Sequence, residues 1–165
     1  VGLGAAFWDP LHALSKSFVT HLGGPGLFLG FFIPDGFSVP MPVDAFTTFG
    51  LVGGMGFWEV VAWASSGSLI GGFVGYHVGG WLRRFQWFKR LYGKRAAEMD
   101  QLVARYGAAA LAATALTPLP YSLGCWAAGA LRMPMSTFLL VSLLRIPRVA
   151  SYLALIYFGL ISVTP

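Results

Sequence analysis

Three carboxylates inside or beside apolar stretches are the first candidates for chemistry. Asp44 lies in the apolar stretch 37–56, where a carboxylate is costly unless it is paired, hydrated or protonated. We expect Asp44 to exchange a proton or to hold a cation, unless its segment lies shallow enough to meet water. Glu59 suits a helix N-terminus, and Asp35, beside the turn signal Pro34-Asp35-Gly36, is more typical of a solvated turn residue. Both remain secondary candidates for proton or ion coupling.

Two arginines lie deep in the last apolar stretch, 135–161. Arg145 and Arg148 are three residues apart and so share one helix face. At that depth they must face the protein interior or a wet cavity, and a planar guanidinium holds phosphate through two hydrogen bonds. The alternative, which the sequence leaves open, is that they pair with Asp44 or Glu59. Pro147 between them frees a backbone carbonyl one turn earlier.

Polar groups surround a second apolar segment that prolines interrupt. Hydroxyls in such a segment either line a path for the substrate or, more commonly, satisfy the backbone of a broken helix. The candidates for substrate or phosphate contact here are Thr114, Thr117, Tyr121, Ser122 and Arg132.

Other kinds of chemistry have little support. There is no nucleophile elbow, no phosphate loop and no pair of catalytic carboxylates, so we do not expect an enzyme. His12, His21 and His77 have no ligand partners at metal-binding spacing, although a proton relay through His77 is left open. We expect no metal and no cofactor.

The composition indicates an integral membrane protein. Of 165 residues, 56% are apolar and 10% are charged, and the mean hydropathy is +0.70. A soluble domain carries about 25% charged residues. The stretches 17–34, 60–82 and 106–131 contain no Asp, Glu, Lys or Arg, and at about 1.5 Å per helical residue each is near or above the thickness of a hydrocarbon core. The single cysteine, Cys125, is expected to pack as a small apolar residue.

The net charge of +5 is concentrated in one segment. Seven of the eleven basic residues lie within 83–105, interleaved with aromatic residues. This pattern is typical of a cytoplasmic membrane interface, and we prefer it to a nucleic-acid surface.

The apolar pattern predicts an all-α fold in one membrane domain, 1–165. Gly23 to Gly26 should kink the first span, and paired prolines should make two segments dip into the membrane and return. The predicted order is a span 10–33, a re-entrant hairpin 34–56, a span 57–82, a basic amphipathic helix 83–105, a second hairpin 106–131 and a span 135–161.

Four glycines at intervals of four residues mark one face of the span 57–82. Such a face allows another helix backbone to approach closely. These glycines are Gly67, Gly71, Gly75 and Gly79.

The two halves have a similar order of features. Pro40 and Pro42 at the tip of the first hairpin precede Pro118 and Pro120 at the tip of the second by 78 residues. With the basic segment in the cytoplasm, the hairpins enter from opposite faces. The result is an inverted repeat, as in many transporters.

Several motifs resemble the DedA family, also called VTT or SNARE-associated Golgi proteins, and most closely its short YqaA-like bacterial branch. The similar stretches cover roughly residues 30–155, and Asp44 stands at the family's acidic position. Many members carry arginines around the second hairpin's proline, whereas this chain has none nearer than Arg132. The motifs are Pro40-Met41-Pro42-Val43-Asp44, the glycine-rich stretch 67–79, Arg105-Tyr106-Gly107, Thr117-Pro118-Leu119-Pro120-Tyr121, Ala127-Ala128-Gly129 and Arg132-Met133.

The resemblance implies a multi-pass protein of the bacterial inner membrane that handles lipids. We expect it to move a lipid-linked phosphate, either undecaprenyl phosphate or a phospholipid headgroup, as a flippase or scramblase, with protons as coupling partners. The alternatives are a small-solute or ion transporter with the same opposed hairpins, and a non-transporting scaffold that recruits lipid or protein through 83–105. The sequence leaves open whether the chain forms a homo-oligomer.

Overall fold

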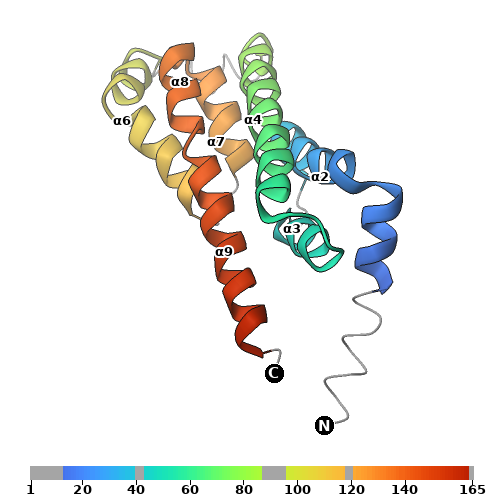
Figure 1. Ribbon diagram of the computed structural model, residues 1–165. Coiled ribbons are helices and arrows are strands. Elements are labelled where there is room, and N and C mark those ends of the chain that lie inside the picture. The colour runs from blue at the N-terminus through green and yellow to red at the C-terminus, as the bar shows by residue number, and fades with distance from the viewer. Residues whose placement is uncertain (1–12, 40–42, 87–95, 118–120, 164–165) are drawn as a thin grey trace.

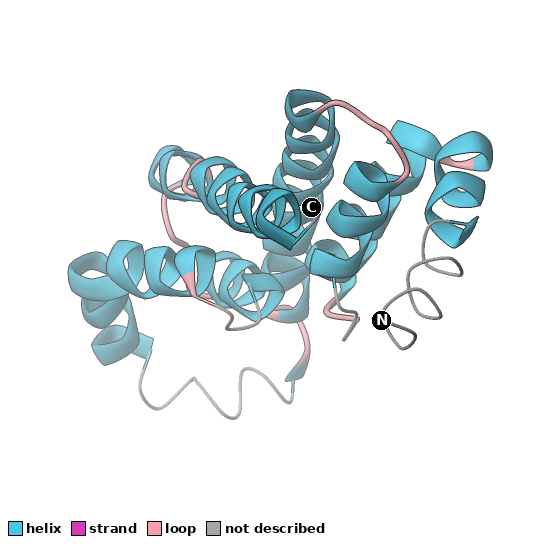
Figure 2. Cartoon of the chain, turned by 60° about the horizontal axis from the view of Figure 1, so that its bottom comes forward, coloured by secondary structure: helices cyan, strands magenta, loops and turns pink. Residues whose placement is uncertain are grey.

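The computed structural model describes residues 13–39, 43–86, 96–117 and 121–163. Within these residues the chain is helical and contains no strand (Figure 2). The helices are Ala13–His21, α2 (Gly23–Phe37), α3 (Val43–Val52), α4 (Phe57–Leu82), α6 (Ala96–Leu116), α7 (Tyr121–Ala130), α8 (Met135–Ser142) and α9 (Arg145–Val163).

The first predicted span is two helices rather than one. Helix Ala13–His21 and α2 meet at an angle of 93°, and Gly23 there has a φ of +45°. The predicted kink is therefore confirmed. The predicted end of the span at residue 33 is wrong, because α2 continues through Pro34 to Phe37 and stops where Ser38 adopts a left-handed conformation. A proline inside a helix is tolerated where neighbouring helices support the backbone.

Each pair of prolines falls between two helices. Residues 40–42 separate α2 from α3, and residues 118–120 separate α6 from α7, so Pro40, Pro42, Pro118 and Pro120 lie outside the described residues. Whether the two helix pairs enter the membrane from opposite faces stays a prediction.

The predicted boundary between the basic helix and the second hairpin is absent. Residues 87–95 lie outside the described residues, but α6 runs without interruption from Ala96 to Leu116. The Ala-rich run 108–113 has high helix propensity, which explains the continuity across residue 105.

The last span is interrupted between α8 and α9. Pro147 has no N–H to give to the carbonyl of Leu143, and the N–H of Ile146 donates to that carbonyl instead at 3.0 Å. The carbonyl that we expected Pro147 to free is thus occupied. Met135–Gly159 together is still long and apolar enough to cross a membrane, and 22% of its most apolar window is buried inside the protein.

Helix α4 forms the centre of the fold, with α2 on one side and α7 on the other (Figure 1). A Cβ atom on Gly71 would lie 2.6 Å from the carbonyl oxygen of Phe32 in α2. One on Gly67 would meet the backbone of Phe28, and one on Gly79 would meet the backbone of Trp126 in α7. The predicted glycine packing face is confirmed.

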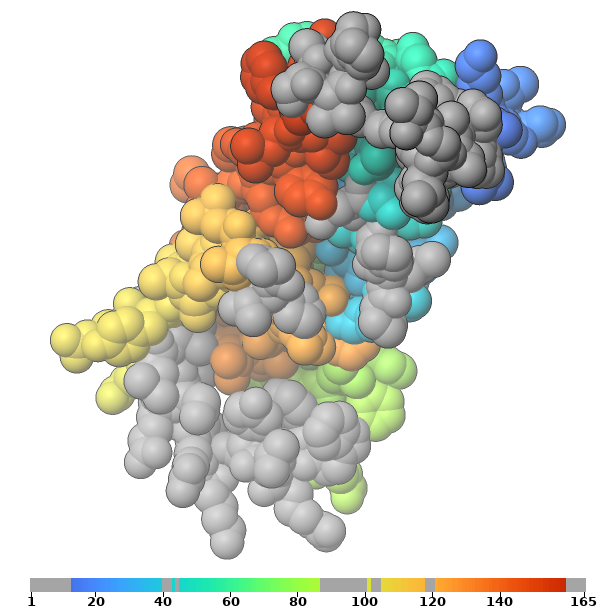
Figure 3. All heavy atoms as spheres, turned by 90° about the horizontal axis from the view of Figure 1, so that it is seen from below, coloured from blue at the N-terminus to red at the C-terminus, as the bar shows by residue number. Residues whose placement is uncertain are grey.

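Two groups of buried apolar residues hold most of the helices together. Leu27, Val60 and Leu153 join α2, α4 and α9, while Leu111, Cys125 and Phe138 join α6, α7 and α8. Cys125 is fully buried, as expected for a small apolar residue. Helix α9 also contacts α3, and Figure 3 shows the two next to each other.

Two adjacent residues of α4, Gly79 and Gly80, allow the glycine packing face to be tested. Gly79→Ala should lower the free energy of unfolding by about 1–3 kcal/mol, because the new methyl group would clash with the α7 backbone. Gly80→Ala is the matched control: its Cβ would lie 3.7 Å from the Gly129 carbonyl oxygen, and alanine favours the helix. Unfolding of both variants in detergent micelles measures the difference, and equal effects would contradict the packing.

Candidate functional site

A buried ion pair lies where α2, α4 and α9 meet. Arg145 Nη2 donates to Asp35 Oδ2 at 2.5 Å, and their side chains are 3% and 8% exposed. Ser68 in α4 bridges them: its hydroxyl donates to the same Asp35 oxygen at 2.6 Å and accepts from Arg145 Nε at 2.8 Å. The three side chains form a closed triangle of hydrogen bonds inside the protein.

An apolar layer lies one helical turn away from this triangle. Phe31, Ala64 and Val149 form a buried cluster, and each is four residues from one member of the triangle on the same helix. Residues four apart in a helix lie on the same face. The same three helix faces therefore supply both the polar triangle and the apolar layer beside it.

Arg145 needs strong partners for its charge. It is the first residue of α9 and is 2% exposed, and a buried cation is costly unless it is paired. The Tyr121 ring lies 4.5 Å from the guanidinium carbon, so the cation rests against an aromatic face as well as against Asp35. The Tyr121 hydroxyl is buried and has no hydrogen-bond partner among the described residues.

Asp35 is the main correction to the sequence analysis. The turn signal around it predicted a solvated residue, but α2 extends past it and buries it at 5% exposure. The open alternative for Arg145, pairing with a carboxylate, is realised, but the carboxylate is that of Asp35, which the sequence analysis did not name as its partner. Ser68 was not a candidate at all. Its only signal was a hydroxyl next to a glycine of the packing face.

Three other predicted charged residues, Arg148, Glu59 and Arg132, lie outside the triangle. Arg148 is partly buried one turn after Arg145, and its charge acts on Asp35. Glu59 is exposed in the first turn of α4. Asp44 belongs to α3, but its side chain lies outside the described residues. Arg132 is exposed at the end of α7, away from the triangle.

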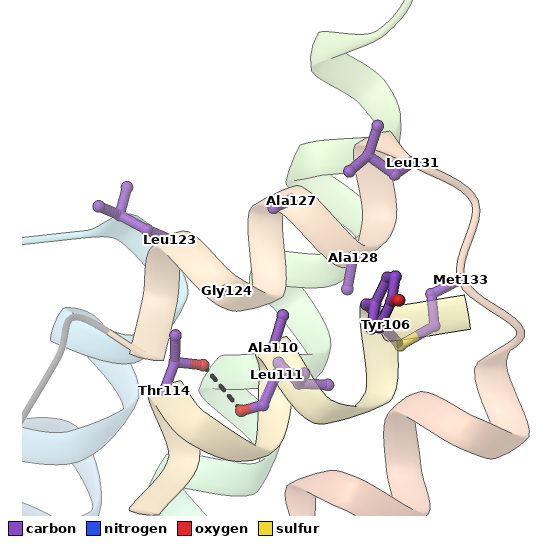
Figure 4. Close-up of a pocket in the computed structure, with 11 residues that line it drawn as sticks. Tyr106, Ala110, Leu111, Thr114, Leu123, Gly124, Ala127, Ala128, Leu131 and Met133 are labelled. Atoms are coloured by element: carbon purple, nitrogen blue, oxygen red, sulfur yellow. Dashed lines mark hydrogen bonds between the residues drawn. The ribbon is translucent and has the colours of Figure 1, made fainter. Parts of the chain in front are cut away.

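Two of the hydroxyls near the break between α6 and α7 donate hydrogen bonds to backbone carbonyls of α6. Thr114 donates to the carbonyl of Leu111 at 2.8 Å, as the dashed line in Figure 4 shows. Thr117 donates to the carbonyl of Ala113 at 2.5 Å. Ser122 is buried at the start of α7. Of these candidates only Tyr121 touches the ion pair.

The two described histidines, His21 and His77, are not part of the triangle. His77 is exposed and its ring packs against Phe73 and Tyr76, while His21 Nδ1 lies 2.9 Å from the carbonyl oxygen of Ser17. His12 lies outside the described residues. No group of three or more His, Cys, Asp or Glu in the described part of the chain could hold a metal ion.

Two hydrogen bonds connect the halves of the chain around the site. Trp126 Nε1 in α7 donates to the carbonyl of Gly36, the residue after Asp35, at 2.9 Å. Tyr76 in α4 donates its hydroxyl to the carbonyl of Met133 at 2.6 Å. The position of the carboxylate is thus coupled to α7 as well as to α9.

The described residues define a helical membrane protein with a buried charged pair beside the short break between α8 and α9. The chain belongs to the VTT domain family, whose model matches residues 39–158, and the resemblance to DedA proteins is confirmed. Ser68 and Arg145 fall within the matched residues, whereas Asp35 precedes them. No curated protein and no solved structure matches the chain significantly.

The ion pair makes a thermodynamic prediction. Asp35→Asn and Arg145→Met should each lower the free energy of unfolding by about 3–5 kcal/mol, because each leaves a buried charge without its partner. The double variant should lose clearly less than the sum of the two.

The free energies of unfolding of the native protein, the two single variants and the double variant, measured in mixed micelles, give the coupling energy between Asp35 and Arg145. Glu59→Gln is the control, since the exposed carboxylate of Glu59 should contribute little. Additive losses in the double variant would contradict the pairing.

Proposed function

We propose that this protein is a transporter that moves a lipid-linked phosphate across the bacterial inner membrane in exchange with, or together with, protons. The observation that carries the proposal is the buried Asp35–Arg145 pair at the break between α8 and α9. Charged groups in membrane segments commonly mark substrate or proton pathways, and transporters commonly bind at broken helices. The substrate class is undecaprenyl phosphate or a phospholipid headgroup.

The chemistry of the pair suits exchange of partners. A guanidinium binds phosphate through two parallel hydrogen bonds, so a phosphate can replace the carboxylate of Asp35. Asp35 would then be left with Ser68 alone as a buried charge, and binding a proton removes that charge. Phosphate and proton would therefore bind cooperatively, and each would raise the affinity for the other by the same factor.

The energetic cost of burying the Asp35–Arg145 pair favours a role in transport over a purely structural role. Burying two charges is expensive, and packed apolar residues stabilise a fold equally well or better. The structural alternative is favoured by one observation, which is that Arg145 already has both hydrogen-bonding partners and the Tyr121 ring. Arg145→Lys distinguishes the two roles, because lysine keeps the positive charge opposite Asp35 but cannot form a bidentate pair of hydrogen bonds with phosphate.

The test is headgroup translocation in proteoliposomes that contain the full chain. Undecaprenyl phosphate is compared with an ordinary phospholipid, with and without a pH gradient. We expect selective, gradient-dependent movement by the native protein. Arg145→Lys should fold but slow transport about tenfold or more, the effect of losing a charge-assisted hydrogen bond of about 1.5–3 kcal/mol. Asp35→Asn should abolish the response to the gradient.

Three outcomes would change the proposal. Full transport by Arg145→Lys would reduce the pair to a structural role. Equal, gradient-independent movement of both lipids would indicate a scramblase. No movement of either lipid would favour a small-solute transporter or a scaffold. Asp44→Asn belongs in the same series, because Asp44 remains the predicted proton site of the first proline-containing segment.

A further inference from the structure

Three arginines from two distant parts of the sequence line one crevice. It has a volume of about 420 Å³ and lies between the last turn of α4 and the end of α7. Arg83 and Arg84 follow α4, and Arg132 follows α7. The remaining lining residues, Gly80 and Gly129, have no side chains, so backbone forms the rest of the crevice wall.

The backbone holds Arg132 in a costly conformation. Its φ is +57°, and its N–H donates to the Gly129 carbonyl while the N–H of Met133 donates to that of Ala128. This is the Schellman arrangement that ends many helices, and glycine is the usual residue at its left-handed position. An arginine there gives up stability that glycine would retain, which points to a use for its side chain.

The crevice concentrates positive charge. Among the carboxylates whose side chains the structure describes, none pairs with Arg83, Arg84 or Arg132. Three guanidinium groups around one space repel each other, and an oxyanion that bonds several of them at once relieves that repulsion.

An apolar groove reaches the same end of α7. It runs between α6 and α7, has a volume of about 440 Å³, and at this end is lined by Tyr106, Leu131 and Met133 (Figure 4). Arg132 of the crevice lies between Leu131 and Met133 of the groove in the chain, so the two cavities flank the same end of α7, although they share no lining residue. A ligand with an anionic head and an apolar tail fits this combination, whereas free phosphate would use only the crevice.

We propose that the crevice formed by Arg83, Arg84 and Arg132 binds the phosphate headgroup of a membrane lipid whose chain lies along the α6–α7 groove. The site is separate from the Asp35–Arg145 pair and does not require transport. Binding and translocation can therefore fail independently. If lipid binds and nothing is moved, only the proposed transport function falls.

The experiment is a titration of the detergent-solubilised full chain with short-chain phosphatidic acid, short-chain phosphatidylcholine and inorganic phosphate. Binding is followed by native mass spectrometry and by the shift in melting temperature. We expect the native protein to bind phosphatidic acid at least tenfold more tightly than the other two ligands. Equal binding of inorganic phosphate would overturn the lipid assignment, and equal binding of phosphatidylcholine would overturn the role of the arginines.

Two variants separate binding from folding. Arg132→Gly removes one cation but suits the left-handed conformation, so it should melt at the same or a higher temperature while binding phosphatidic acid at least tenfold more weakly. Lys16→Gln is the matched control, because Lys16 is an exposed cation of helix Ala13–His21 that lines neither the crevice nor the groove. Unchanged binding by Arg132→Gly, or equal weakening by Lys16→Gln, would overturn the site.

Discussion

The close approach of helix backbones along the glycine face of α4 is the constraint on which the rest of the structure depends. Helix α2 lies against Gly67 and Gly71, and α7 lies against Gly79. Because no side chain separates these backbones, Ser68 reaches both Asp35 and Arg145. A larger residue on this face would move α2 outward and open the ion pair, so packing and charge pairing depend on each other.

The ion pair also explains how a broken span remains stable. Pro147 lacks the N–H that would bond to the Leu143 carbonyl, and Arg145, the first residue of α9, is buried, where an unpaired cation is costly. The carboxylate of Asp35 and the ring of Tyr121 compensate for this position. Asp35, Ser68 and Tyr121 all contact Arg145. A change in the charge or position of one of them therefore alters the interactions of the others, as a coupling site requires.

The Asp35–Arg145 pair and the arginine crevice lie at different positions along the axis of α4. Ser68 and Arg83 are fifteen residues apart, which corresponds to roughly 22 Å of helix. In our proposal the crevice at the end of α4 captures a phosphate headgroup, and the buried pair acts further along. Gly71, Gly75 and Gly79 lie between the two places, at the surfaces where α2 and α7 meet α4.

The sequence by itself determined the class of protein and its local breaks. Low charge and long apolar stretches predict membrane helices, glycine spacing predicts the packing face, and the proline pairs mark where helices are interrupted. These features depend on neighbouring residues. The partner of Arg145 depends instead on which helices meet: Asp35 is 110 residues away and lies in a turn signal that α2 overrides. The arginine crevice likewise joins the ends of α4 and α7. Only tertiary structure decided both sites, because a charge pair or a shared crevice requires three-dimensional proximity that local pattern does not encode.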